Sequence, residues 1–176
     1  DVCSSDLKRY SAATLAKHPE LKGKDIETTR NSCAKFVHTP TTIINFVEGS
    51  RCTPEKQRAK NSPFTHLLPP KAGGIAFTLA SMGEQFNAIL DVTLIYPDNS
   101  QHIALDMLMG RLKRVVIQAE ILPVDAAVIG DYFNDPVFRD NFQQWLNQRW
   151  QRKDQQIECY LKQNQRSLQA TPVSQS

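Results

Sequence analysis

The order of apolar runs along the sequence predicts an α/β fold. Two runs rich in β-branched and apolar residues, Thr41–Val47 and Ile89–Tyr96, are typical of buried strands. Between them, Gly73–Met82 has a helical pattern, and Arg111–Leu122 predicts a third strand. A long helix is expected from Pro136, because proline is favoured at the first helical position and Asn134 or Asp135 can cap it.

Three further segments complete the predicted order of elements. Residues Asp25–Val37 place apolar side chains on one helical face, and Pro40 blocks continuation of that helix. A short helix around Ile103–Met109 is expected to end at Gly110, and Pro97–Ser100 is a strong turn. Beyond about Lys162 polar residues dominate, so residues 163–176 are expected to form a polar, disordered tail.

Composition favours a globular chain and excludes some classes. The chain has 176 residues, which fits one domain, and 40% of them are hydrophobic, too many for a disordered protein. The net charge is only +3, which does not call for a nucleic acid partner. No apolar run approaches the roughly 18 residues that a membrane-spanning helix needs. The four cysteines have no metal-ligand spacing and are expected to be reduced thiols. The charge of Arg51 could favour a thiolate at Cys52, but Cys52 is expected to be a plain neighbour of the binding residues and not a nucleophile.

Candidate binding residues follow the first predicted strand directly. Glu48, Gly49, Ser50 and Arg51 come in immediate succession, and the glycine allows a sharp turn or a close approach to a ligand. The guanidinium of Arg51 is a planar fork of donors that matches the oxygens of a phosphate. The structural alternative is a glycine turn in which Glu48 and Arg51 form a surface ion pair.

A second set of candidates stands at the start of the helix predicted for Gly73–Met82. Lys71 lies just before the first turn, where free N–H groups and the helix dipole attract anions. Gly73 and Gly74 each cost about 1 kcal/mol of helix stability relative to alanine, which suits a backbone that passes close to a ligand or a neighbouring strand. Lys71 and Arg51 are therefore predicted to bind one phosphate; the alternative for Lys71 is a surface lysine in a loop.

These blocks and their order resemble the glycerophospholipid acyltransferase superfamily, which contains the lysophosphatidic acid acyltransferases. That family has Phe-Pro-Glu-Gly-Thr-Arg after a strand, and this chain has Phe46–Arg51 with Val47 for proline and Ser50 for threonine. Its Pro-x-Lys-x-Gly element is matched by Pro69–Gly73, and its final strand closing on proline loosely by Leu94–Pro97. Within the superfamily, the likeness is to bacterial inner-membrane enzymes similar to the lysocardiolipin type.

The resemblance implies a function and a set of partners. It implies transfer of an acyl group from acyl-CoA or acyl carrier protein to the hydroxyl of a lysophospholipid such as 1-acyl-glycerol-3-phosphate, with no cofactor and no metal. Glu48, Gly49, Ser50, Arg51, Lys71 and Gly73 would bind the substrate. It also implies an α/β sheet flanked by helices, as in glycerolipid acyltransferases, and a parent protein at the cytoplasmic face of a bacterial inner membrane.

One block of the family is absent from the sequence. The family uses a His-x4-Asp motif upstream of the Glu-Gly block, and no histidine here has an aspartate at that spacing; the histidines are His18, His38, His66 and His102. All four are expected to be ordinary surface or turn residues.

Asp1–Leu7 resembles a translated sequencing adapter and is expected to be non-native. The chain is thus interpreted as a leader, the C-terminal part of an acyltransferase domain over residues 8–162, and the tail; such a piece is expected to lack activity and to associate through an uncovered apolar sheet edge.

Two segments of the sequence are also consistent with functions other than acyl transfer. Thr53–Pro63 is predicted to be a basic loop, which is either solvated, a mobile flap over the phosphate, or a contact to anionic lipid headgroups. The C-terminal helix carries an aromatic stripe that either packs on the sheet or inserts into a membrane surface; its residues are Phe138, Phe142, Trp145 and Trp150. A non-enzymatic module that binds nucleic acid or protein through the loop and this helix is the alternative function. A phosphate-handling hydrolase would need a metal cluster or an activated nucleophile, and the sequence shows neither.

Overall fold

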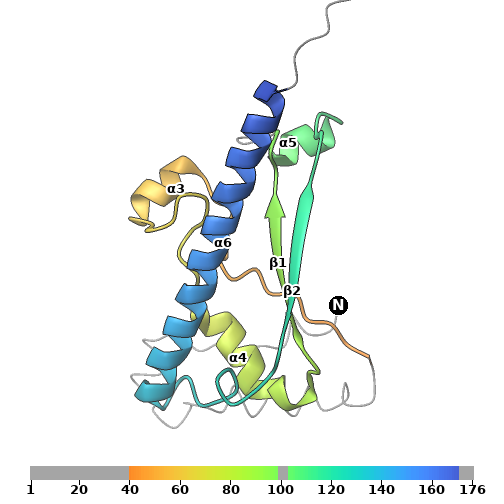
Figure 1. Cartoon of the computed structure of the whole chain (residues 1–176). Coiled ribbons are helices and arrows are strands. Elements are labelled where there is room, and N and C mark those ends of the chain that lie inside the picture. Colours follow the sequence, from red (N-terminus) through yellow and green to blue (C-terminus); the bar gives the residue numbers. More distant parts are fainter. Residues whose placement is uncertain (1–39, 99–102, 171–176) are drawn as a thin grey trace, which may run out of the picture. The chain divides into compact units, whose positions relative to one another are not determined.

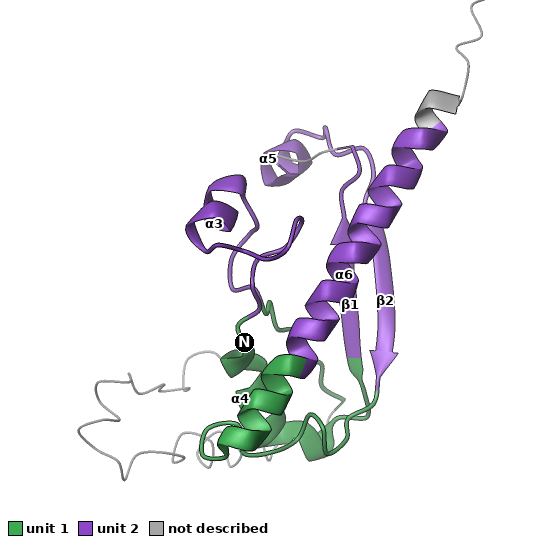
Figure 2. Ribbon diagram, turned by 60° about the vertical axis from the view of Figure 1, so that its left-hand side comes forward, with its two compact units in different colours: residues 1–47, 71–89, 123–144 green, residues 48–70, 90–122, 145–176 purple. Residues whose placement is uncertain are grey.

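The computed structural model describes residues 40–98 and 103–170, and its chain divides into two compact units (Figure 2). The described part of unit 1 comprises residues 40–47, 71–89 and 123–144. The described part of unit 2 comprises residues 48–70, 90–98, 103–122 and 145–170. The helix predicted at Asp25–Val37 and the adapter-like Asp1–Leu7 lie outside the described residues.

The described elements are helices and one small sheet, which confirms the broad α/β class. The two strands β1 and β2 form one antiparallel sheet (Figure 1). The elements in chain order are α3 (Pro54–Ala59), α4 (Ala72–Met82), the 3-10 helix η3 (Gly83–Gln85), β1 (Ile89–Ile95), α5 (Ile103–Leu108), β2 (Val116–Leu122) and α6 (Pro136–Ala170). The helices predicted at Gly73–Met82 and Ile103–Met109, and the strand at Ile89–Tyr96, are thereby confirmed within a residue at each end. The third strand is shorter than predicted, because residues 111–115 precede it as irregular chain.

Unit 1 has an aromatic and aliphatic core between α4 and the first turns of α6. Phe142 is fully buried, and its ring lies 5.7 Å from that of Tyr132 in an edge-to-face arrangement and 6.0 Å from that of Phe138. Such ring pairs add about 0.5–1.5 kcal/mol each beyond their buried area. The buried residues contributed by α4 are Ala72, Ala76, Phe77, Leu79, Ser81 and Met82.

One glycine of unit 1 is required by close packing. A Cβ atom built on Gly130 would lie 2.4 Å from the ring of Phe138, closer than any side chain could be accommodated without movement. Gly130 therefore lets the loop before α6 approach the aromatic cluster. The predicted aromatic stripe on α6 is thus a packing face. The sequence predicted that it packs on the sheet, but Phe142 packs against Tyr132 and Phe138 instead.

Helix α6 begins as the sequence predicts and continues further than expected. The Asp135 carboxylate accepts hydrogen bonds from the N–H groups of Val137 and Phe138, at 2.9 and 3.1 Å, so Asp135 is the cap and Pro136 the first helical residue. Residues 163–170 are helical, so the expectation of disorder from residue 163 is wrong over this stretch. Propagation of an established helix needs little apolar content, which explains why polar residues there remain helical.

Unit 2 places one face of the sheet against α6. Alternate residues of β1 point inward, with Thr93 and Ile95 buried, while the residues between them are exposed. Figures 1 and 2 show the part of α6 after residue 145 running along this sheet. The buried apolar residues of unit 2 are Leu68, Ile95, Leu146, Trp150 and Ile157.

The predicted strand at Thr41–Val47 is wrong. The segment is irregular, residues 41–46 are exposed, and the sheet formed by the described residues contains only β1 and β2. A strand is maintained by backbone hydrogen bonds to a neighbour, and β-branched residues alone do not supply that neighbour. Ile44 and Phe46 are consequently among the exposed large apolar side chains.

The predicted basic loop Thr53–Pro63 is partly helical. Thr53 caps α3, because its hydroxyl accepts from the N–H of Lys56 at 3.3 Å, and Pro54 occupies the first turn. No residue of α3 is buried, so the basic side chains of this segment are presented to solvent on a short ordered helix.

Candidate functional site

The Glu48–Arg51 segment forms a turn at the start of unit 2. Gly49 has a φ of +67°, a left-handed conformation that costs glycine little and other residues more. The prediction of a glycine-dependent turn is therefore confirmed. Ser50 and Arg51 are exposed after it, whereas Glu48 is only partly exposed.

Glu48 turns toward the interior of unit 2. Its Oε2 atom accepts a hydrogen bond from the backbone N–H of Leu68 at 3.1 Å. Burial raises the pKa of this carboxyl above its usual value, and the Leu68 amide and the Trp150 indole oppose that shift. Among the described ion pairs none joins Glu48 to Arg51, so the surface pair considered as the structural alternative is wrong. Glu48 thereby stabilises the loop that ends at Leu68.

Arg51 keeps its guanidinium available. Within the described residues its side chain makes no hydrogen bond or ion pair, and only its carbonyl oxygen is engaged, by the Lys56 ammonium at 3.5 Å. An exposed guanidinium without a competing carboxylate can bind an anionic group in its planar fork. The geometry is compatible with the predicted phosphate contact and does not test it.

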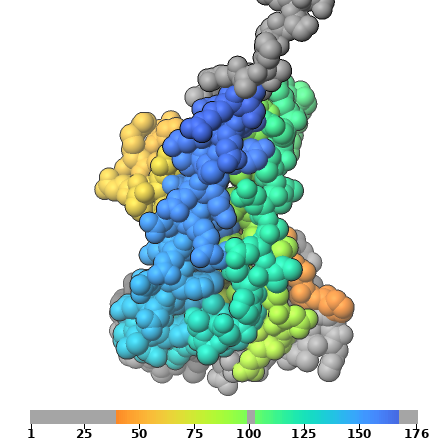
Figure 3. Space-filling model, viewed as in Figure 1, coloured from red at the N-terminus to blue at the C-terminus, as the bar shows by residue number. Residues whose placement is uncertain are grey.

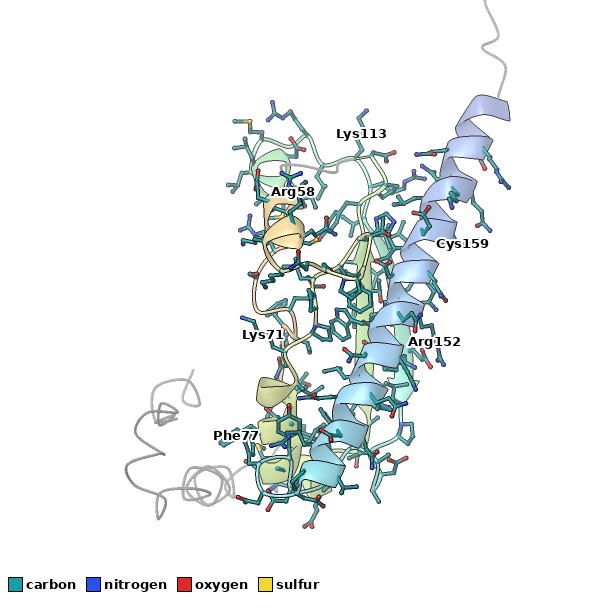
Figure 4. All side chains as sticks on the ribbon, turned by 90° about the vertical axis from the view of Figure 1, so that its left-hand side faces the viewer. Arg58, Lys71, Phe77, Lys113, Arg152 and Cys159 are labelled. Atoms are coloured by element: carbon teal, nitrogen blue, oxygen red, sulfur yellow. The ribbon has the colours of Figure 1, made fainter. Side chains whose placement is uncertain are left out.

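Lys71 stands where the sequence predicted, as the residue that precedes the first turn of α4. It has extended backbone, makes no side-chain capping bond and is exposed, and Figure 4 shows the labelled side chain projecting outward. A Cβ built on Gly73 would meet nothing within 4 Å, so this glycine is not required by any protein neighbour. At Gly74 the nearest atom, from Asn45, would be 3.5 Å away, an ordinary contact. The first turn of α4 is thus open at Gly73.

A backbone hydrogen bond links the two motif segments within unit 1. The N–H of Lys71 donates to the carbonyl of Val47 at 2.9 Å. Val47 is the residue directly before Glu48, so the Pro-x-Lys-x-Gly segment is bonded to the chain where the Glu-Gly-Ser-Arg turn begins. Arg51 belongs to unit 2 and Lys71 to unit 1, and their convergence on one phosphate stays a prediction.

Two polar arrangements in unit 2 were not anticipated from the sequence. In the first, the Asp154 carboxylate accepts from the N–H groups of Thr65 and His66 at 3.0 and 2.7 Å, and the His66 ring bonds Glu158 at 2.6 Å. His66 is therefore a half-buried residue that ties its loop to α6, rather than an ordinary surface histidine. Hydrogen bonds from Lys162 and then His66 hold the pKa of Glu158 below its usual value.

The second arrangement is an ion cluster between β1, β2 and α6. The Arg149 guanidinium bonds Asp91 at 2.9 Å and Glu120 at 2.6 Å, and Lys153 pairs with Asp91 and donates to the Val92 carbonyl at 2.9 Å. Hydrogen bonding from Arg149 lowers the pKa of Glu120. A cavity of about 100 Å³ lies beside the cluster. Only the i, i+4 spacing of Arg149 and Lys153 signals a shared helical face; no local pattern links them to Asp91.

Cys52 is not activated by its neighbour. Burial first, and then the negative charge of Glu48, raise the pKa of this thiol above its usual value. The thiolate alternative is therefore not supported, and the raised pKa agrees with the expected role of Cys52 as a plain neighbour. Cys3, Cys33, His18, His38 and His102 lie outside the described residues.

Known proteins similar to this chain include acyltransferases that are named for lysophospholipid substrates. Lysocardiolipin acyltransferase 1 of Mus musculus is 23% identical over 136 residues, covering 70% of this chain and 34% of the mouse protein. The 2-acyl-1-lysophosphatidylinositol acyltransferase of Saccharomyces cerevisiae is 26% identical over 170 residues, covering 88% of this chain and 43% of the yeast protein. The chain therefore spans less than half the length of these relatives. The similarity supports the acyltransferase family and does not favour the non-enzymatic alternative.

Other comparisons give no match. No family model matches the sequence, and no solved structure is similar to it. Within residues 40–98 and 103–170, no helix is both long enough and apolar enough to span a membrane.

Proposed function

We propose that this chain is part of a lysophospholipid acyltransferase and carries the acceptor-binding residues of that enzyme. The observation that carries the proposal is that the similar proteins, although remote in sequence, are lysophospholipid acyltransferases. The ordered Glu-Gly-Ser-Arg and Pro-x-Lys-x-Gly segments support it from the sequence. The acceptor is a lysophospholipid such as 1-acyl-glycerol-3-phosphate, and the donor is acyl-CoA or acyl carrier protein, with no metal or cofactor.

In this proposal Arg51 and Lys71 bind the phosphate of the acceptor. Both side chains are exposed, and Gly73 leaves the start of α4 open to an anion. Glu48 holds the loop behind the turn, Gly49 supplies its backbone conformation, and Ser50 offers a hydroxyl to the phosphate.

The reaction is acyl transfer from a thioester to a hydroxyl. The acceptor oxygen forms an ester bond with the acyl carbon, the carbon–sulfur bond breaks, and the hydroxyl proton passes through a general base to the departing thiol. The family's base is the histidine of His-x4-Asp, which this sequence does not contain. The parent protein is proposed to work at the cytoplasmic face of a bacterial inner membrane, with the lipid surface as its partner.

Arg51→Ala is expected to weaken binding of monomeric lysophosphatidic acid by about tenfold to a hundredfold, since a charge-assisted hydrogen bond contributes about 1.5–3 kcal/mol. Isothermal titration of the 176-residue chain measures this. Arg166→Ala, which removes another exposed guanidinium near the end of α6, is the matched control and should change little. Equal losses in the two variants would show a general charge effect and refute the assignment of Arg51.

A double-mutant cycle with Lys71→Ala tests whether the two cations share one phosphate. Residues that bind the same group show a coupling energy of about 0.5–3 kcal/mol, whereas independent sites are additive. Strict additivity of Arg51→Ala and Lys71→Ala would contradict a shared site even if each variant alone bound more weakly.

This chain by itself is expected to show no transfer activity above background. Loss of a general base costs about 10²–10⁴ in rate, and the sequence has no His-x4-Asp to supply one. Release of CoA thiol from acyl-CoA in the presence of lysophosphatidic acid, followed with a thiol reagent, is the measurement. A rate that depends on the acceptor and disappears in Arg51→Ala would contradict the expectation of inactivity and support the binding assignment.

A further inference from the structure

Asp154 of α6 holds two consecutive backbone amides of the loop that follows α3. Its Oδ2 atom accepts a hydrogen bond from the N–H of Thr65 at 3.0 Å, and its Oδ1 atom accepts one from the N–H of His66 at 2.7 Å. Hydrogen bonds to an ionised carboxylate are roughly twice as strong as neutral ones, and here the carboxylate is half-buried. Figure 3 shows the yellow surface of this loop against the blue surface of α6. The carboxylate therefore fastens the loop backbone to the helix.

The loop held by Asp154 leads directly to Glu48. Leu68, two residues after His66, is fully buried, and its N–H donates to the Glu48 carboxylate at 3.1 Å. Arg51 follows Glu48 by three residues, across the turn at Gly49. A fixed Glu48 therefore fixes one side of the turn that presents the guanidinium.

A second route reaches the other side of the turn through α3. The Gln57 side-chain amide donates to the carbonyl of Thr65 at 2.7 Å. Its neighbour on α3, Lys56, donates from Nζ to the carbonyl of Arg51 at 3.5 Å. This last contact is long, so the route through the buried Leu68 amide is the stronger one. Both routes start from the stretch of backbone that Asp154 fastens to α6.

We propose that Asp154 is a positioning residue, which holds Arg51 in place for the phosphate of the acceptor through the loop and Glu48. The proposal rests on the proposed role of Arg51 in phosphate binding. A turn without this support would have to be ordered when the ligand binds, and ordering a single backbone residue already costs a factor of about ten in affinity. Asp154 thus contributes to affinity without contacting the ligand.

Asp154→Asn tests the proposal, because positioning and simple electrostatics predict opposite signs. The asparagine side chain keeps one acceptor oxygen, while its NH2 group cannot accept from a backbone N–H. Loss of the paired contact should weaken binding of monomeric lysophosphatidic acid to the 176-residue chain about tenfold, as measured by isothermal titration. Removal of a negative charge would by itself strengthen binding of this anion. Unchanged or tighter binding in Asp154→Asn would therefore overturn the proposal.

Two matched variants on the same helix identify the contact that matters. Asp140→Asn removes the same charge at an exposed position of unit 1 and should not weaken binding. Glu158→Gln alters the partner of the His66 ring and leaves both backbone amides on Asp154. Glu158 is 40% exposed, so binding should change by no more than about threefold. A loss in Glu158→Gln as large as that in Asp154→Asn would overturn the assignment to the backbone contact.

A double-mutant cycle tests whether Asp154 acts through Arg51. With Arg51→Ala already in place, Asp154→Asn should cost little further affinity, because the side chain that it positions is gone. A residue that only stabilises the fold would cost the same affinity in both backgrounds, and independent effects add. Additive losses would therefore overturn the proposal, even if each single variant bound more weakly.

Hydrogen exchange separates failure of this inference from failure of the phosphate assignment. The amide of Leu68, whose acceptor is Glu48, should exchange at least about tenfold faster in Asp154→Asn, while amides within β1 and β2 keep their wild-type rates by NMR. Faster exchange at Leu68 in a chain that binds no lysophosphatidic acid would refute the phosphate role of Arg51 and support the positioning of the turn. A wild-type rate at Leu68, or equally faster exchange throughout the sheet, would overturn the positioning.

Discussion

Asp91→Ala is expected to destabilise unit 2 by about 3–5 kcal/mol, because it leaves the buried cation Lys153 without its carboxylate and removes one of the two carboxylates that pair with the half-buried Arg149. Removing one partner of a buried ionic group costs more than the group contributes, since the remaining charge stays out of water. Urea unfolding followed by tryptophan fluorescence measures the effect, and both tryptophans of the chain, Trp145 and Trp150, belong to unit 2. The urea midpoint should fall sharply.

Glu120→Ala is the control for that prediction. Glu120 bonds the same guanidinium but is 47% exposed, so water replaces its contact and the midpoint should move far less. Equal shifts in Asp91→Ala and Glu120→Ala would contradict the view that burial of Lys153, rather than the number of ion pairs, determines the cost.

Phe142→Ala is expected to destabilise unit 1 by about 3–5 kcal/mol. Its side chain is 0% exposed and contacts the rings of Tyr132 and Phe138, so truncation removes buried apolar surface and leaves a cavity. Because the tryptophans lie in unit 2, hydrogen exchange of peptides from residues 71–89 and 123–144, read by mass spectrometry, is the suitable measurement.

Val137→Ala provides the comparison on the same helix. This side chain is 70% exposed and its truncation should cost no more than about 0.5 kcal/mol. Exchange rates that rise as much in Val137→Ala as in Phe142→Ala would show that the first turns of α6 open independently of the aromatic core.

The elements predicted correctly are those specified by local chemistry. Asp135 and Pro136 encode the start of α6, and Gly110, with a φ of +67°, encodes the end of the short helix before it. The strand predicted at Thr41–Val47 is wrong, because a strand needs a neighbouring strand to hydrogen-bond with, and its own residues cannot specify that neighbour. For residues 163–170 the prediction of disorder is wrong, because the helix continues from the preceding turns despite the polar composition of these residues.

In the candidate site, too, the features set by neighbouring residues were predictable and those set by distant residues were not. The left-handed conformation of Gly49 and the position of Lys71 before α4 follow from neighbouring residues and were predictable. The inward turn of Glu48 toward Leu68 was not, because the partner lies in a loop whose path depends on α6. The same holds for Asp91 and Arg149, which are far apart in sequence and meet only through packing.

The open face of the sheet in unit 2 has a practical consequence for handling the chain. Its outward side chains include Leu90, Leu94 and Ile117, which are exposed while alternate residues face α6. Attraction between such faces strengthens with warming and with sulfate or phosphate salts, and fades in the cold. Purification near ice temperature in dilute chloride buffer should therefore keep the chain dispersed, whereas salting-out steps would drive it into precipitates.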